Sequence, residues 1–216
     1  MLAEILSKLA KTNTKLVAVS KTKPAAQILA MYEQGQRIFG ENRIQELVDK
    51  QAELPADISW HAIGHLQTNK VKYIAPFVAL IHSVDSLKLL KEINKQAARN
   101  DRTIDCLLQI KIAAEESKFG LSESSALELL QSEAYQQMKN IRIVGLMGMA
   151  TFTEDEAQVR QEFRQLKNFF EQLKSDFFAT DPHFIEISMG MSGDFELAQA
   201  EGSTMVRIGS LLFGSR

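Results

Sequence analysis

The sequence predicts one α/β domain that spans residues 1–216 and folds as a (βα)8 barrel of the TIM type. Short apolar or β-branched segments recur eight times along the chain, and helix-like segments separate them. The chain has 216 residues, of which 45% are hydrophobic, so it can bury one large core. No linker rich in Gly, Pro or Ser divides it. A doubly wound open sheet is the alternative that the same pattern allows.

The first half of the chain begins with an amphipathic helix within residues 1–15. The strands expected after it are KLVAVS (15–20), RIFG (37–40), SWHAIG (59–64) and ALIHSV (79–84). Each is a short, mostly apolar run that stops at or just before a Gly, a Ser or an Asp. Such continuous apolar runs are typical of parallel strands that are buried on both faces.

The second half of the chain repeats this alternation with longer helices. Helices are expected over 85–99, 122–139 and 154–177, where apolar residues recur at spacings of three and four. The remaining strands are expected at DCLLQIKI (105–112), RIVGLMGMA (142–150), FIEISMG (184–190) and TMVRIG (204–209). Because a helix lies between successive strands, the chain can return to start each new strand in parallel.

Composition excludes several classes of function. The formal net charge is −2 and the basic residues are scattered, which argues against a nucleic-acid or anionic-membrane surface. The longest apolar run, APFVALI, is too short to span a bilayer, and the first residues lack the features of a secretory signal. We therefore expect a soluble, cytoplasmic protein.

Cys106 is the single cysteine, so we expect it to act as a small buried hydrophobe. The pair His61 and His65 flanks Gly64 in a strand context and does not predict a metal site.

Polar residues gather where the predicted strands end, which in such barrels is the face that carries the active site. The seventh strand ends in SMGMSGD, where Ser192 belongs to a glycine-containing turn. The eighth ends in RIGS, so that Gly209 and Ser210 form a second turn close by. Two such turns on adjacent strands predict a cradle for a phosphate group. The alternative is that Ser192 or Asp194 merely caps the following helix.

Arg207 lies in the eighth strand, where alternation places it on the same face as Met205 and Gly209. If that face lines the barrel, the guanidinium is buried and requires an acceptor. The acceptor is either a structural partner, Glu186 or Asp194, or a bound ligand.

Two lysines follow the first strand in the segment VAVSKTKP. A lysine at such a strand end can present a neutral amine to an aldehyde. Lys21 is the better candidate, because Lys23 precedes a proline and is steered to the rim. A lysine, a phosphate cradle and an arginine at one mouth predict pyridoxal phosphate. The alternative is that both lysines are ordinary solvated charges.

The motifs VAVSKTKP, FGENRIQE, WHAIGHLQTNK, SKFG, GLMGMA, SMGMSGDFELA and GSTMVRIGSLLFG occur in this order between residues 17 and 214. Together they resemble the pyridoxal phosphate homeostasis protein family, also called the YggS/PROSC type. The resemblance implies a barrel similar to the N-terminal domain of alanine racemase, with pyridoxal phosphate held as a Schiff base. One position departs from the family pattern: Ala62 stands where a larger hydrophobe is usual.

The resemblance also assigns site residues. It implies that Lys21 holds the cofactor, that Asn42 lies near its ring and that Arg207 faces the pyridine nitrogen. The phosphate would be bound by three residues of the two turns, which are Ser192, Gly209 and Ser210. We further expect His61 and Met149 beside the cofactor, and Lys118 at the rim of the same mouth, where it would meet free cofactor.

An arginine facing the ring nitrogen disfavours protonation of that nitrogen, so carbanion chemistry should be weak. The chain also leaves no room for the second domain that completes the active site of barrel racemases. We therefore expect a monomeric pyridoxal phosphate-binding protein without robust catalysis, which buffers the cofactor or passes it to apo-enzymes. The alternatives are an amino-acid racemase or decarboxylase that uses Lys21 with help from Lys23 or His61, and a scaffold that binds no cofactor.

Overall fold

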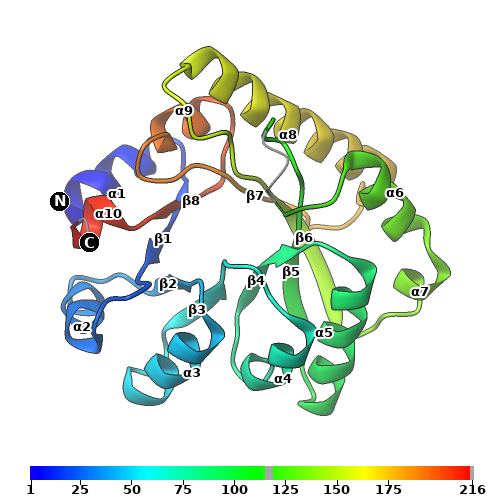
Figure 1. The fold of residues 1–216 in the computed structure, drawn as a ribbon, viewed down its shortest axis with the longest axis horizontal. Helices are drawn as coiled ribbons and strands as arrows, with labels where there is room; N and C mark the ends of the chain where they lie inside the picture. The colour runs from blue at the N-terminus through cyan, green and yellow to red at the C-terminus, as the bar shows by residue number, and fades with distance from the viewer. Residues whose placement is uncertain (115–118, 215–216) are drawn as a thin grey trace.

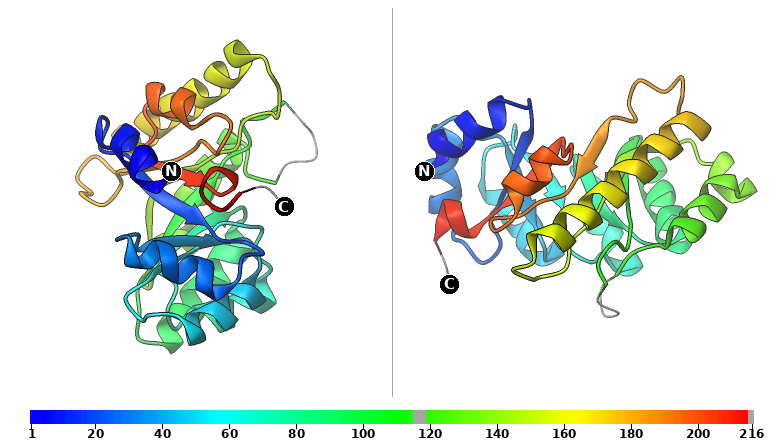
Figure 2. Two further views of the ribbon diagram at one scale, coloured as in Figure 1. Left: turned by 90° about the vertical axis from the view of Figure 1, so that its left-hand side faces the viewer. Right: turned by 90° about the horizontal axis from the view of Figure 1, so that it is seen from above.

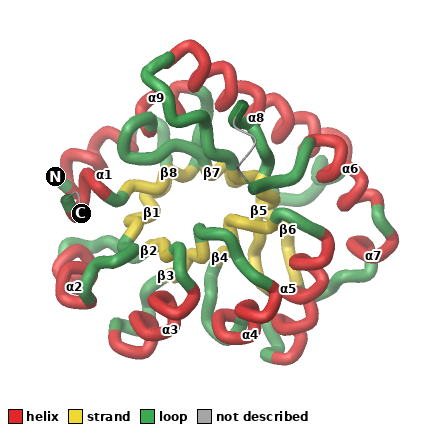
Figure 3. Tube along the Cα trace, in the orientation of Figure 1, coloured by secondary structure: helices red, strands yellow, loops and turns green. Residues whose placement is uncertain are grey.

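The structure is a computed structural model that describes residues 1–114 and 119–214, and its strands form a closed, all-parallel barrel. The strands pair in chain order from β1 to β8, and β8 pairs with β1 to close the ring. Figures 1 and 3 show this ring of strands with the helices arranged around its outside. The predicted (βα)8 barrel is therefore confirmed, and the open sheet is excluded.

Each of the eight predicted strands is present, although most are shorter than expected. Their bounds are β1 Lys15–Val19, β2 Ile38–Glu41, β3 Ser59–Ala62, β4 Leu80–Val84, β5 Ile104–Gln109, β6 Ile141–Met147, β7 Glu186–Ser188 and β8 Met205–Ile208. The helices in the described part of the chain are α1 Leu2–Ala10, α2 Ala25–Glu33, α3 Ile44–Glu53, the 3-10 turn η1 Thr68–Lys70, α4 Val71–Ile74, α5 Leu87–Arg99, α6 Glu123–Gln131, α7 Glu133–Gln136, α8 Glu156–Asp176, α9 Phe195–Ala200 and α10 Ser210–Phe213.

The sixth helix and the fifth strand illustrate how the elements differ from the prediction. The helix expected over 122–139 is divided into α6 and α7 at Ser132, whose backbone is extended (φ −67°, ψ 137°). The Ser132 hydroxyl accepts a hydrogen bond from the Tyr135 amide, so it caps α7 and makes the break favourable. The fifth strand ends at Gln109, and Ile110 forms an isolated bridge with Leu121 while its amide still donates to the Met147 carbonyl.

Two apolar layers hold the barrel together. The larger layer lies between the strands and the surrounding helices, and it includes Cys106, which is fully buried as expected. Burial raises the pKa of the Cys106 thiol, so it remains neutral. The smaller layer fills the inside of the barrel with Val17, Leu80, Leu107, Val144, Met147 and Met205. Buried polar residues, among them His61, His82 and Arg207, lie among these apolar side chains.

The N-terminal helix α1 packs on the outer face of the strands that close the barrel. Its buried residues Leu2, Ile5 and Leu9 form one cluster with Val206 and Ile208 of β8. Figure 2 shows α1 beside α9 and α10, so the two ends of the described chain lie on the same side of the molecule. Among the described residues, no helix combines the length and the apolar character that crossing a bilayer requires.

Gly145 in β6 is required by the close approach of β7. Its φ is +154°, and a Cβ atom built there would lie 1.8 Å from the Glu186 carbonyl oxygen. We expect Gly145→Ala to lower the free energy of unfolding by roughly 3 kcal/mol, since backbone would have to move. Gly193→Ala is the matched control, because its Cβ would meet nothing within 4 Å. Urea unfolding of both variants measures the difference, and equal stabilities would contradict this account.

Candidate functional site

Lys21 lies in the tight turn that follows β1. Ser20 is fully buried at the strand end, whereas the Lys21 side chain is exposed. The turn is closed by a hydrogen bond from the Lys23 amide to the Ser20 carbonyl, and Thr22 has a left-handed backbone (φ +65°). The ammonium of Lys21 makes no hydrogen bond or ion pair with another residue of the described chain. It therefore projects from a fixed backbone as an available amine.

A buried polar cluster holds that turn in place from below. The Lys50 ammonium donates to the Ser20 carbonyl at 2.8 Å and to Oε1 of Glu41 at 2.6 Å. The Ser20 hydroxyl donates to the same Glu41 oxygen at 2.6 Å. The Thr22 amide donates to Oε2 of Glu46 at 2.8 Å. Residues 20–22 are thus tied to both β2 and α3.

Sequence reasoning missed this cluster, although one signal was present. Lys50 shares the buried face of α3 with Ile44 and Leu47, at a spacing of three residues. A lysine in such a register requires a buried acceptor, and that acceptor is Glu41. Burial raises the pKa of the Glu41 carboxyl, against the opposing effect of its hydrogen bonds from Lys50 and Ser20. Its Oε2 atom is buried and has no hydrogen-bond partner among the described residues.

Lys23 has a structural role in the same turn. Its ammonium donates to the carbonyl oxygens of Phe213 and Gly214, at 3.0 and 3.3 Å. These bonds tie the end of β1 to α10, so the amine of Lys23 is engaged while that of Lys21 is not. The two lysines are thereby distinguished by their contacts.

The two predicted phosphate-binding turns lie in contact. The Gly209 amide donates to the Ser192 hydroxyl at 3.3 Å, and Ser210 follows as the exposed first residue of α10. The Ser192 hydroxyl does not cap α9, because that helix begins at Phe195 and shows no side-chain cap bond. Instead, Asp194 closes the first turn by accepting the Met191 amide at 2.5 Å. The structure thus brings the predicted cradle residues together.

Arg207 is 4% exposed and points into the barrel, so the face that it shares with Met205 is the one that lines the barrel. Its Nη1 donates to the carbonyl and the hydroxyl of Ser188, at 2.8 and 2.7 Å, and its Nη2 donates to the Gly148 carbonyl at 3.1 Å. Glu186, the first structural partner considered above, is bonded instead to Lys15 and Thr204. That alternative is wrong, because Glu186 lies at the start of β7 whereas Arg207 lies near the end of β8.

The Arg207 guanidinium is a buried cation held by neutral acceptors. Within residues 1–114 and 119–214, no carboxylate forms an ion pair with it. Burial lowers its pKa to about 10, partly offset by the charge of Asp194, so it remains charged at neutral pH. Three of its five N–H groups are used by described residues, which leaves Nε–H and one Nη2–H for another acceptor.

Asn42 and Met149 lie at the ends of β2 and β6. Asn42 is exposed, and its backbone is so close to Gly64 after β3 that a Cβ there would lie 2.4 Å from the Asn42 carbonyl oxygen. Met149 is half-buried against the apolar interior of the barrel. Both therefore lie at strand ends on the face that carries Lys21 and Arg207. Lys118, the predicted rim residue, falls outside the described residues.

His61 takes a different place from the other predicted residues. It is buried inside the barrel, where its Nδ1 atom lies 2.9 Å from Nε2 of His82. His82 in turn contacts the Ser188 hydroxyl through Nδ1, at 2.9 Å. His61 thus reaches Arg207 only through His82 and Ser188. Sequence reasoning did not assign His82 or Ser188, because buried polar residues of strands carry no local signal of their partners.

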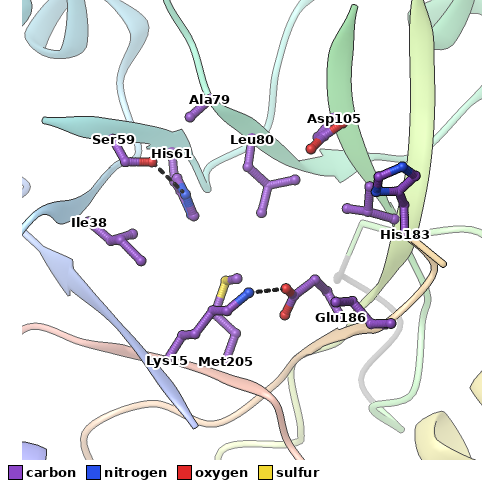
Figure 4. A pocket seen from close by; sticks show the side chains of 12 residues that line it. Lys15, Ile38, Ser59, His61, Ala79, Leu80, Asp105, His183, Glu186 and Met205 are labelled. Atoms are coloured by element: carbon purple, nitrogen blue, oxygen red, sulfur yellow. Dashed lines mark hydrogen bonds and ion pairs between the residues drawn. The ribbon is translucent and has the colours of Figure 1, made fainter. Parts of the chain in front are cut away.

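A cavity of about 320 Å³ opens at the opposite end of the barrel, and His61 lines it. Its other lining residues include Lys15, Ile38, Ser59 and Leu80, which begin strands β1 to β4. Figure 4 shows the ion pair of Lys15 with Glu186 across this cavity and the contact between Ser59 and His61. The cavity is therefore at the amino-terminal mouth, away from Lys21.

The two buried histidines make stability depend on pH. Burial, with a smaller effect of Lys15, lowers the pKa of His61 to about 3, and burial lowers that of His82 below its usual value. In the unfolded chain these two histidines bind protons at a pH at which they remain neutral in the folded chain. The free energy of unfolding therefore falls as the pH drops below about 6.5. His61 should account for about 2 kcal/mol between pH 7 and pH 5, and His82 should add to this in the same direction.

The replacement His82→Gln isolates this effect, because a glutamine can accept from Ser188 and donate to His61 without titrating. We expect its free energy of unfolding to change less steeply with pH than that of the wild type. His183→Gln alters an exposed histidine and should keep the wild-type slope. Chemical unfolding at a series of pH values measures the slopes, and parallel curves for all three proteins would contradict the prediction.

Comparison with known proteins agrees with this geometry. The family model described as "Alanine racemase, N-terminal domain" matches residues 2–216. The pyridoxal phosphate homeostasis protein of Aquifex aeolicus is 42% identical over 203 residues, which cover 94% of this chain and 87% of that protein. This chain belongs to the pyridoxal phosphate homeostasis protein family. The human member is 39% identical over 213 residues, covering 94% of this chain and 76% of that one.

Solved structures of related proteins superpose closely on this chain. PipY of Synechococcus elongatus PCC7942, solved without pyridoxal phosphate, is 37% identical and superposes with a TM-score of 0.89 over 99% of this chain and all (100%) of its own. The same protein with pyridoxal phosphate bound gives a TM-score of 0.86. Alanine racemase from Bartonella henselae is 18% identical and gives a TM-score of 0.74 over 96% of this chain and 59% of its own. At this level of identity, the similarity to alanine racemase shows only a shared fold.

Proposed function

We propose that this protein binds pyridoxal phosphate reversibly on Lys21 and serves in intracellular vitamin B6 homeostasis. The observation that carries the proposal is the buried Arg207 guanidinium, which is charged and has unused donors at the mouth where Lys21 presents its amine. The names of the relatives and the PipY structure with pyridoxal phosphate bound support the choice of ligand.

The residues present fit this cofactor. Ser192, Gly209 and Ser210 would bind its phosphate, since they form two adjoining turns with a hydroxyl and amides at their surface. Arg207 would face the ring nitrogen, and Asn42 and Met149 would lie beside the ring. His61 would contribute from inside the barrel, through His82 and Ser188.

The bound cofactor supplies an aldehyde and an electron-accepting ring. Arg207 can only donate hydrogen bonds, so it would hold the ring nitrogen as an acceptor and disfavour its protonation. Lys21 would hold the aldehyde carbon from a turn fixed by Lys50 and Glu46. These residues bind and orient the cofactor while keeping its ring a weak electron sink. We therefore propose that the protein buffers the cofactor, or passes it to apo-enzymes, as a cytoplasmic monomer without robust catalysis.

Two measurements on one sample test this proposal. The protein is saturated with pyridoxal phosphate, desalted, and mixed with an apo-aminotransferase, whose recovered activity reports transfer of the cofactor. In parallel, the loaded protein is incubated with amino acids in deuterated water, and exchange of the α-proton is followed by NMR. We expect recovery of the aminotransferase and exchange no faster than with free cofactor.

The opposite results have distinct meanings. Exchange much faster than with free cofactor would overturn the non-catalytic role and favour a racemase or decarboxylase. A protein that retains no cofactor after desalting would overturn the binding role and favour a scaffold.

A further inference from the structure

A continuous chain of hydrogen bonds runs through the inside of the barrel from Arg207 to the opposite mouth. It passes from the Arg207 guanidinium to the Ser188 hydroxyl at 2.7 Å and from there to Nδ1 of His82 at 2.9 Å. It continues from Nε2 of His82 to Nδ1 of His61 at 2.9 Å. It ends where Nε2 of His61 lies 3.4 Å from the Ser59 hydroxyl, in the cavity of Figure 4.

Arg207 fixes the direction of the first bond. A guanidinium has no acceptor, so the Ser188 oxygen must accept from Arg207. Ser188 is fully buried, and the only described group left to receive its hydroxyl proton is Nδ1 of His82. If His82 donated instead, the Ser188 proton would be buried without a partner, which is strongly unfavourable. Ser188 therefore donates to His82.

The same direction continues through both rings. Since Nδ1 of His82 accepts, its single proton lies on Nε2, and that atom donates to Nδ1 of His61. The His61 proton is then also on Nε2, where it points toward Ser59 and the cavity. One proton per ring is expected, because burial keeps both histidines neutral. Every dipole in the chain turns its negative end toward the guanidinium, so the bonds strengthen one another.

This chain of hydrogen bonds stabilises the buried Arg207 cation in place of a carboxylate. Arg207 is buried without an ion pair in the described part of the chain, and the Ser188 hydroxyl becomes a stronger acceptor once its own proton is donated to His82. Ser188 also receives Nη1 of Arg207 on its carbonyl, so two bonds to one residue fix the plane of the guanidinium. The donors left over, Nε–H and one Nη2–H, consequently keep a fixed direction.

We propose that Ser188, His82 and His61 are positioning residues that orient Arg207 toward the cofactor ring, through a one-way hydrogen-bond chain in which both histidines carry their proton on Nε2. The role of Arg207 toward the ring rests on the proposed function. The direction of the hydrogen-bond chain does not depend on any cofactor.

The direction is tested by NMR on the unloaded protein. Nitrogen-15 spectra of labelled histidine distinguish the two neutral tautomers, and the variants His82→Gln and His61→Asn assign the signals. We expect the Nε2–H tautomer for both buried rings in the wild type, and mixed tautomers for His82 in Ser188→Ala. A proton on Nδ1 of either ring in the wild type would overturn the chain.

The positioning role is tested with the loaded protein. Ser188→Ala should bind pyridoxal phosphate about tenfold more weakly, as expected for losing one hydrogen bond to a charged group, and should show an altered absorbance spectrum. The matched control is Ser203→Ala, which removes a buried hydroxyl that donates within the β7–β8 connection and lies outside the chain. It should keep the wild-type spectrum and affinity.

The outcomes separate the two hypotheses. If Ser188→Ala matches the wild type in spectrum and affinity, the positioning role is wrong even when the protein binds the cofactor. If the wild type binds no pyridoxal phosphate, the proposed function fails and with it the role toward the ring, while the histidine tautomers still decide the direction of the chain.

Discussion

Replacing Lys21 with alanine should abolish covalent retention of pyridoxal phosphate. The wild-type protein, incubated with the cofactor and desalted, should keep an absorbance band near ~420 nm, as a lysine-bound aldehyde does. Lys21 is the lysine of its turn whose ammonium makes no contact with another described residue, while the turn itself is fixed by Lys50 and Glu46. Removing the amine therefore removes the attachment point without disturbing its support.

The matched control for Lys21→Ala is Lys23→Ala, which replaces the other lysine of the same turn. Lys23 donates to the carbonyls of Phe213 and Gly214, so its loss should loosen α10 while leaving the covalent band intact at saturating cofactor. Reduction with borohydride and peptide mapping would then identify the modified residue. A band that persists in Lys21→Ala and disappears in Lys23→Ala would show that the anchor was assigned to the wrong lysine.

Replacing Lys50 with methionine should lower the free energy of unfolding by about 3 kcal/mol, because it leaves a buried carboxylate without its partner. Glu41 is fully buried, and Lys50 supplies its 2.6 Å ion pair while also bonding the Ser20 carbonyl. The variant should also capture pyridoxal phosphate more weakly, since the Lys21 turn loses its support from α3. Urea unfolding and spectral titration measure the two effects.

The double replacement Glu41→Gln with Lys50→Met provides the control for this prediction. A neutral amide can still accept from Ser20 and no longer carries a charge that needs a partner, so the double variant should recover much of the lost stability. It should not recover cofactor capture, because the Lys50 bond to Ser20 remains absent. A single Lys50→Met variant as stable as the wild type would contradict the importance of this pair.

The sequence by itself determined the barrel and the approximate position of each strand. Eight apolar runs separated by helical segments admit few other arrangements, because parallel strands need helical crossovers. Alternation along a single strand also placed Arg207 on the same face as Met205, and the structure shows that this face lines the barrel. The contact between Ser192 and Gly209 followed from placing two turns on neighbouring strands. Each of these depends on local pattern plus one rule of barrel geometry.

Only the tertiary structure decided the polar partners inside the barrel. Lys50 and Glu41 are nine residues apart and bond to a turn on another strand, while Ser188 and His82 are separated by 106 residues. No periodicity predicts such pairs, because side-chain hydrogen bonds depend on which strands become neighbours and on the angstrom-scale register between them. The same holds for His61, which a strand-end pattern put beside the cofactor, whereas its ring lies beside the opposite mouth. Local sequence thus fixes which groups enter the barrel, and the packed strands determine what each group meets there.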